Sequence, residues 1–249
     1  MIRSSMLRVA ASIAAAIVLV VFASGRAAAP AAKAKPTKPT WQSAQKYTVR
    51  TIEGFSVHVN NDLLTAHKDL GDKALKLLAT KLYDITRVVP AKALTELRKV
   101  HIWLERDNPE GTCACYHPSR RWLTSHGRNP GKARCVEIAN AARFLAWSNT
   151  QPSMVLHELA HGYHHQVITH GNKDVQGAYK QAVASKRYEK VLYANGRERR
   201  AYALNNQTEY FAELTEAYFG VNDFYPFVRA EIIKHDPQMY KALKKVWGG

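Results

Sequence analysis

The chain has 249 residues, of which 46% are hydrophobic and 22% are charged. This composition is ordinary for a globular protein with one sizeable domain, and it excludes a wholly disordered chain. The formal net charge is +16, but residues 1–40 contain six Lys or Arg and no acid, which leaves +10 for the rest. The basic residues are scattered without a basic-aromatic motif, so we expect no specific nucleic-acid binding. The charge serves solubility or attracts an anionic envelope polymer.

The first predicted element is an export signal. Arg3 and Arg8 precede a mostly apolar stretch at 9–24, which small residues follow. This order is typical of a secretory signal peptide, which we place at 1–29. The stretch is shorter than the roughly 20 residues that span a bilayer, but Pro30 is a poor first residue for a mature chain, so a retained signal-anchor is the alternative. Both interpretations predict an exported protein, secreted, periplasmic or associated with the cell envelope. It would contact a membrane only if the leader is retained.

An Ala/Pro/Lys-rich linker is expected at 30–45, followed by one folded domain at 46–249. Loose alternation of apolar residues around Gly54 predicts two strands at 48–60. A helix is predicted at 63–89, where apolar residues recur at helical spacing before Pro90. The further predicted elements are a short helix at 91–98, strands at 99–106 and 135–141, and helices near 150–168, 173–193, 205–219 and 225–246. Strands and one helix precede a helical half, which is an α+β arrangement.

Residues 107–132 are rich in Gly, Pro, Ser and Arg, and we expect a long loop there. The three cysteines of the chain are Cys113, Cys115 and Cys135. In an oxidising compartment a disulfide is expected, and Cys113 and Cys115 are too close in sequence to pair with each other. Cys135 would therefore pair with one of them, closing a loop of about 20 residues and stabilising the fold by about 3 kcal/mol. The alternative is a metal site that uses Cys113, Cys115 and His117.

The stretch MVLHELAHGYHHQ at 154–166 contains the pattern His-Glu-x-x-His within a predicted helix. His157 and His161 are four residues apart, so they lie on one helical face and can hold a single metal ion, for which Zn²⁺ is the usual occupant. Glu158 is turned by about 100° from His157. It would flank the metal without binding it, which is the position of a general base.

Two histidines do not complete such a site, so a third ligand is required. The metzincin pattern needs Gly three residues and His six residues beyond His161, and it is excluded because His164 and Val167 stand there. His164 and His165 follow on the same helix and could not close a tetrahedron, so we interpret them as supporting or surface residues.

The better source of a third ligand is the segment YALNNQTEYFAELTEAYFG at 202–220. Glu209, Glu213 and Glu216 would share one face of a helix there. Acids stacked on one face repel one another, and a divalent cation opposite them would remove that repulsion. Any of the three could therefore bind the metal.

HELAH followed some fifty residues later by NNQTEYFAE resembles the zincin metallopeptidases of the gluzincin type. Within that group it is most similar to the catalytic domain of anthrax lethal factor and the proline-proline endopeptidases. The similarity covers 154–219, roughly a quarter of the chain. It implies a zincin-like metallopeptidase domain, in which a small mixed sheet precedes a helical half with the HExxH helix and a Glu-ligand helix. The N-terminal half carries no motif of the family, and the cysteines have no counterpart in it.

The resemblance also implies roles for individual residues. Glu209 would be the third zinc ligand, and Glu213 would support a zinc-binding histidine. Tyr202 would face the substrate carbonyl. The segment 136–141 resembles weakly the edge strand on which such enzymes bind an extended substrate, with Asn140 and Ala141 in contact with it.

Taken together, the motifs predict an exported metalloendopeptidase that binds one Zn²⁺ per chain, acts on a peptide or protein substrate, and uses Glu158 and Tyr202 in catalysis. Two other functions are compatible with the same residues. One is a catalytically silent zincin-fold protein that binds an envelope polymer. The other is a zinc hydrolase of non-peptide or cell-wall amides.

Overall fold

The structure of the chain is a computed structural model that describes residues 46–109, 111 and 113–248. The predicted signal peptide at 1–29 and the linker at 30–45 lie outside the described residues. The described residues belong to one unit, Lys38–Gly249. Among them, no helix has both the length and the apolar character needed to cross a membrane.

A mixed sheet in the order β1-β2-β3-β5-β4 forms the first layer of the domain. β1 (Tyr47–Ile52) and β2 (Phe55–Asn60) are an antiparallel hairpin, and Gly54 at its turn has a φ of 82°, a conformation that glycine adopts without strain. β3 (Ile102–Leu104) pairs with β2 in parallel. The two strands predicted at 48–60 and the one at 99–106 are therefore confirmed.

The other end of the sheet differs from the prediction. β5 (Val136–Ile138) lies between β3 and β4, parallel to β3, and β4 (Ala114–Tyr116) is the edge strand, antiparallel to β5. The expectation that 136–141 forms the edge is wrong, because β4 covers it. The segment predicted as a loop at 107–132 contains this strand and the short helix α3 (Arg120–Ser125). A three-residue strand is too short to show an alternating pattern.

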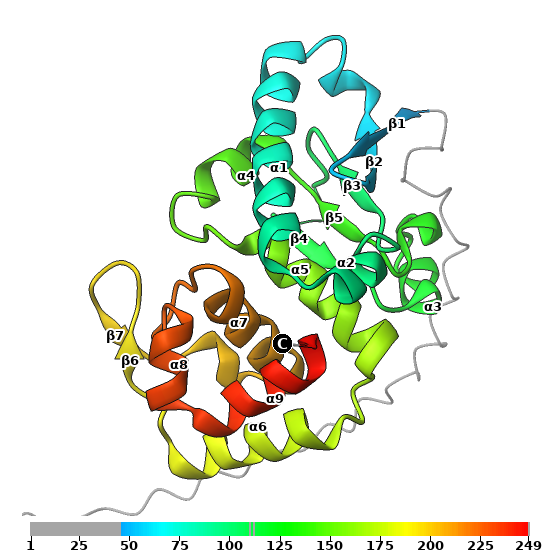
Figure 1. The fold of residues 1–249 in the computed structure, drawn as a ribbon. Coiled ribbons are helices and arrows are strands. Elements are labelled where there is room, and N and C mark those ends of the chain that lie inside the picture. Colours follow the sequence, from blue (N-terminus) through cyan, green and yellow to red (C-terminus); the bar gives the residue numbers. More distant parts are fainter. Residues whose placement is uncertain (1–45, 110, 112, 249) are drawn as a thin grey trace, which may run out of the picture. The chain divides into compact units, whose positions relative to one another are not determined.

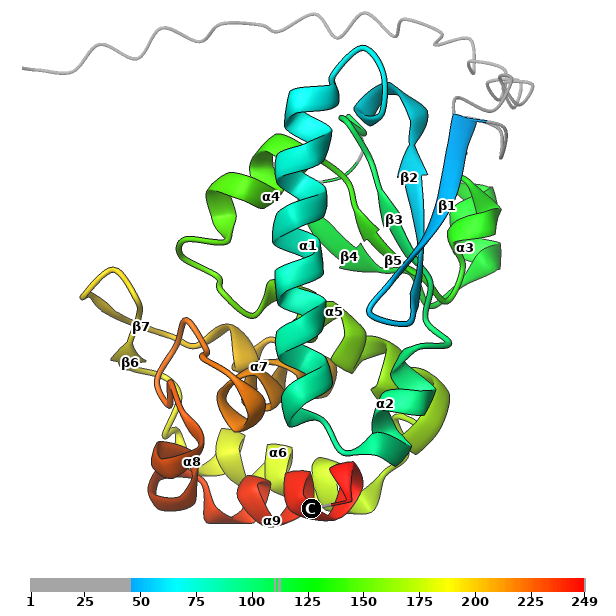
Figure 2. The ribbon, with the colours of Figure 1, turned by 45° about the horizontal axis from the view of Figure 1, so that its top comes forward.

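Helix α1 (Lys68–Val88) covers one face of the sheet (Figures 1 and 2). It buries residues at helical spacing, namely Ala74, Leu75, Leu78, Leu82 and Ile85. Pro90 follows it and stands at the N-cap of α2 (Ala91–Leu97), as the fixed φ and missing N–H of proline favour. α3 lies on the opposite side of the sheet from α1 (Figures 1 and 2). α4 (Ala141–Trp147) begins after β5.

The rest of the described chain is mainly helical. The elements are α5 (Met154–Tyr163), extended by a π-helical turn at His164–Ile168, α6 (Lys173–Ser185), α7 (Gln207–Phe219), α8 (Arg229–His235) and α9 (Pro237–Trp247). Two predicted helices are shorter than expected. The one at 173–193 ends at Ser185, where Lys186 turns left-handed and a small hairpin of β6 (Val191–Leu192) and β7 (Glu198–Arg199) follows. The one at 225–246 is divided at Asp236, whose side chain caps α9.

Helix α5 lies between the sheet and the group α6–α9 (Figure 1). It is buried on nearly every side, and every one of its ten residues except His161 is buried. α5 is therefore a core element, and its polar residues His157 and Glu158 are buried together with its apolar ones. The predicted α+β fold is confirmed in this coarse form. α5 brings its side chains to the sheet on one side and to α7 on the other.

Candidate metal centre between α5 and α7

Three nitrogen and oxygen atoms converge where α5 faces α7. The Nε2 atoms of His157 and His161 are 3.0 Å apart. Glu209 Oε2 lies 3.0 Å from His157 Nε2 and 3.2 Å from His161 Nε2. The two histidines are one helical turn apart, and Glu209 stands in the first turn of α7, where Asn206 accepts hydrogen bonds from the Thr208 and Glu209 N–H groups. The structure thus brings together the three residues that the sequence suggested as metal ligands.

The spacing of these atoms fits a zinc ion. Ligands at about 2.0–2.1 Å from a tetrahedral zinc are about 3.3 Å from one another, close to the three observed separations. The hydrogen bonding points the same way. His157 Nδ1 is 2.7 Å from Glu216 Oε1, so an Nδ1–H that donates to Glu216 leaves the Nε2 lone pair facing the Glu209 carboxylate. Only a cation between them, a proton or a metal, makes that contact favourable.

The pKa values show how strongly these groups attract a cation. Burial lowers the pKa of His157, but hydrogen bonds to Glu209 and Glu216 more than offset it and hold the pKa well above its usual value. Burial raises the pKa of Glu209, while the hydrogen bonds from His157 and His161 lower it to about 2. Glu209 is therefore an anion at neutral pH, as a zinc ligand must be.

Two further acids of α7 lie behind His157. Glu216 makes the direct hydrogen bond to Nδ1, whereas Glu213 Oε1 is 3.8 Å from that atom. The buried Glu213 Oε2 has no hydrogen-bond partner among the described residues. Burial raises the pKa of Glu216 to about 7, and burial and the neighbouring Glu216 raise that of Glu213 well above its usual value. The geometry gives Glu216 the supporting position that the resemblance implies for Glu213.

Glu158 is close to the centre without belonging to the three-atom cluster. Its Oε2 accepts a hydrogen bond of 2.7 Å from the backbone N–H of Tyr116 on β4. This contact joins the HExxH helix to the edge strand. Sequence reasoning did not find it, because a backbone donor on a three-residue strand leaves no signal in the side-chain pattern.

A cavity of about 370 Å³ opens beside the cluster. His157, Glu158 and Tyr202 line it together with Ala114 of β4. Its remaining walls include aromatic and charged side chains, namely Trp147, Tyr193, Arg199, Asp223 and Phe224. The Arg199 guanidinium lies over the rings of Tyr193 and Phe224, at 5.0 and 5.4 Å from their centroids. Of the three clustered residues only His157 lines the cavity, and the acids Glu213 and Glu216 line it as well. A ligand of several atoms therefore has room next to His157.

Tyr202 stands at the mouth of this cavity on a short 3-10 turn, Tyr202–Leu204. Its ring centroid is 6.4 Å from that of His157, and the side chain is 47% exposed. Burial and the nearby Glu209 raise the pKa of its hydroxyl. The hydroxyl therefore keeps its proton at neutral pH and can donate a hydrogen bond.

The chain was compared with protein-family models, curated proteins and solved structures. None matches it. The assignment of function therefore rests on the geometry of the described residues.

Asn140 and Ala141 are not among the residues that line the cavity. The Asn140 side chain caps α4 by accepting from Arg143 N at 2.8 Å, and it donates to Asp107 Oδ1 at 2.9 Å. The Ala141 N–H donates to the Glu105 carbonyl. Both residues are thus hydrogen-bonded within the fold, and the strand before them, β5, lies between β3 and β4 in the sheet. The structure does not bring them to the candidate site.

All three cysteines lie in the described part of the chain, and none forms a disulfide. The predicted bridge from Cys135 to Cys113 or Cys115 is therefore wrong. Cys113 is buried, with Sγ 3.5 Å from the Met154 sulfur on α5. The strand register places Cys115 opposite Glu137, two residues beyond Cys135. A disulfide needs Cβ atoms about 3.8 Å apart, which this offset does not provide.

Proposed function

We propose that the protein is a zinc-dependent metalloendopeptidase with a zincin-like fold. The observation that carries the proposal is the convergence of His157 Nε2, His161 Nε2 and Glu209 Oε2 beside a cavity that Glu158 also lines. These are the three ligands of a gluzincin, with the general base next to them. The order of a mixed sheet, a buried HExxH helix and a glutamate helix is also what a zincin fold requires.

Zinc held by these three residues would polarise the carbonyl of a substrate and acidify a water molecule. Glu158 would accept a proton from that water as the water oxygen bonds to the carbonyl carbon, and it would pass the proton to the amine nitrogen as the C–N bond breaks. The hydroxyl of Tyr202 donates a hydrogen bond to the carbonyl oxygen as negative charge develops on it. Glu216 fixes the orientation of the His157 ring through Nδ1.

The edge strand β4 provides the surface for an extended peptide. Cys113 O and His117 N bond to the β5 side, to Ala139 N and Cys135 O. Backbone groups alternate in direction along a strand, so those of Ala114 and Tyr116 point to the open edge, where Glu158 already accepts from Tyr116. A substrate that pairs with this edge would place its backbone along the cavity. β4 thus takes the role that the sequence suggested for 136–141.

The cellular setting belongs to the proposal as well. A signal peptide at 1–29 would export the enzyme, and the basic surface of the folded part suits a location beside anionic envelope polymers. A membrane would be a partner only if the leader is retained.

Two variants test the mechanism. Glu158→Gln keeps the shape of the site and removes the base, so we expect normal zinc content and a loss of turnover of about 10²–10⁴-fold or more. Glu209→Ala removes a ligand, so we expect loss of the zinc ion bound at this centre. Zinc per chain is measured by elemental analysis, and turnover with a quenched-fluorescent peptide library.

Glu189→Gln, at an exposed position, is the matched control and should retain both zinc and activity. Retained turnover in Glu158→Gln would disprove the mechanism. Full zinc content in Glu209→Ala would mean that a different residue completes the site. A wild type that binds zinc but cleaves no peptide would disprove the endopeptidase function.

A further inference from the structure

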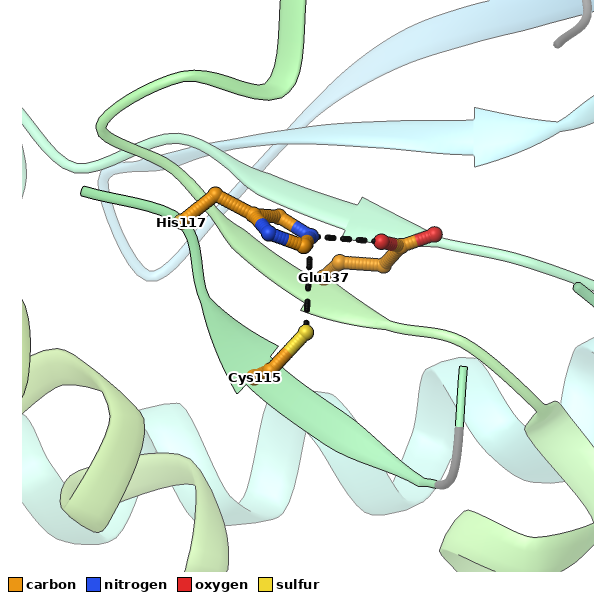
Figure 3. Close-up of side chains that lie close together, drawn as sticks. All are labelled: Cys115, His117 and Glu137. Carbon is orange, nitrogen blue, oxygen red and sulfur yellow. Dashed lines mark hydrogen bonds and ion pairs between the residues drawn. The ribbon is translucent and has the colours of Figure 1, made fainter. Parts of the chain in front are cut away.

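A second group of metal-binding side chains lies on the sheet, outside the proposed active site. Cys115 Sγ is 3.4 Å from His117 Nε2, and the same nitrogen is 2.6 Å from Glu137 Oε2. The three ligand atoms lie within 4.8 Å of one another. Figure 3 shows the side chains, from β4, the residue after it and β5, pointing toward one another.

We propose that Cys115, His117 and Glu137 bind a second zinc ion, with a structural role. A thiolate, an imidazole and a carboxylate are the ligand types that zinc takes in proteins. This site does not rest on the proposed peptidase function, because it shares no residue with the first centre.

The position of the cluster separates it from the active site. Side chains alternate between the two faces of a strand. Ala114 and Tyr116 point to the α5 side, where Ala114 lines the cavity and the Tyr116 hydroxyl contacts His165. Cys115 and His117 therefore point to the other face of the sheet. A metal there would join the edge strand β4 to its neighbour β5 without contact to α5.

The surroundings balance the charge of such an ion. Lys132 bridges Glu105 and Glu137, with Nζ 2.6 and 2.5 Å from their carboxylate oxygens. Zinc held by a neutral His117 and a Cys115 thiolate would set the negative charges of Glu105, Glu137 and Cys115 against the three positive charges of the ion and the Lys132 ammonium. The metal-bound site would therefore contain no unpaired buried charge.

The geometry needs a small adjustment for zinc. In a tetrahedral site the Cys sulfur and His nitrogen are about 3.6 Å apart, and the His nitrogen and Glu oxygen about 3.3 Å. The first separation nearly matches the observed 3.4 Å. The second requires the His117–Glu137 contact, now 2.6 Å, to open by roughly 0.7 Å.

Cobalt titration of the metal-stripped full chain tests the second site directly. Cobalt bound to a thiolate gives an intense near-ultraviolet charge-transfer absorption, and the first centre has no sulfur ligand to produce it. We expect this absorption in the wild type and in Glu209→Ala, and its loss in Cys115→Ser. Cys135→Ser, a cysteine outside the cluster, is the matched control and should keep the absorption.

Zinc content separates the two proposals. We expect Glu209→Ala and Cys115→Ser each to lose one zinc ion per chain relative to the wild type, and the double variant to lose both. If the wild type and Glu209→Ala show no thiolate–cobalt absorption, the second site is disproved whatever the fold of Cys115→Ser. Absorption that persists in a folded Cys115→Ser also disproves it. Neither result bears on the Glu209 site.

Discussion

His157 is the residue on which the candidate active site depends most. Its Nε2 faces Glu209 and His161, and its Nδ1 is bonded to Glu216. The two ring nitrogens have different tasks, one to bind a cation and one to hold the ring in place. A carboxylate behind a zinc-binding histidine orients the ring and increases its basicity.

Glu216→Gln should weaken zinc binding at this centre about 10–100-fold, because the amide keeps the shape but not the charge that supports His157. Glu213→Gln is the matched control on the same helix. It should change zinc affinity by less than about tenfold, since Glu213 does not hydrogen-bond to the ring. Competition with a chromophoric chelator measures both affinities, in a Cys115→Ser background so that only one site contributes. Equal weakening by the two variants would contradict the assignment.

Residue spacing predicted the centre of the site because its members lie on helices. His157 and His161 are i and i+4, and Glu209, Glu213 and Glu216 share a face, so the helical period alone brings each set together. Residue spacing could not predict the contacts between different helices and strands. Glu216 at His157 Nδ1 depends on how α7 lies against α5. Asn140 looked available for a substrate, but local capping of α4 uses it.

At the scale of elements, the position of α1 depends on a close backbone contact with the turn that precedes it. Gly71 stands in the first part of this helix, where a Cβ atom would lie 1.9 Å from the Leu63 carbonyl oxygen. No side chain fits there, so η2 (Asn61–Leu63) and α1 pack backbone against backbone. Gly177 in α6 is also helical, but its nearest neighbour would be the flexible end of Gln238 at 3.4 Å.

The same substitution should therefore have opposite effects at these two glycines. Alanine favours a helix over glycine by about 1 kcal/mol, and Gly177→Ala should gain about 0.5–1 kcal/mol of unfolding free energy. Gly71→Ala must displace backbone and should lose about 1–3 kcal/mol. Urea unfolding followed by circular dichroism measures both. If Gly71→Ala proved as stable as Gly177→Ala, the close packing of α1 on η2 would be refuted.

The helices and strands were predictable from the sequence where their pattern of apolar residues was long enough. α1 and α7 repeat their apolar residues over three or more turns, and the hairpin around Gly54 has its turn residue in place. β4 has three residues and no alternation, so the strand that lies beside the active site was predicted as a loop. The predicted disulfide had a different origin, since it was inferred from an oxidising compartment and the cysteine spacing. The sheet register, which sequence does not reveal, sets Cys115 opposite Glu137.

At the scale of the whole domain, α5 connects the sheet to the helical half (Figure 2). The first centre takes ligands from α5 and α7, and the second from β4 and β5. Each metal ion would therefore join two separate elements, with 52 positions between His157 and Glu209 and 20 between His117 and Glu137. A ligand that binds only the folded state stabilises it by the free energy of binding at the prevailing ligand concentration.

Metal removal should consequently lower the melting temperature of the domain. At free zinc about 100 times the dissociation constant, one site contributes about 2.7 kcal/mol. In a domain of this size each kcal/mol corresponds to about 2–4 °C, so the first centre should account for about 5–11 °C. Scanning calorimetry of the wild type and of Glu209→Ala, each with chelator and with zinc, isolates this contribution as the difference between their two zinc-induced shifts. Equal shifts in the two proteins would show that no zinc joins α5 to α7, because only the first centre distinguishes them.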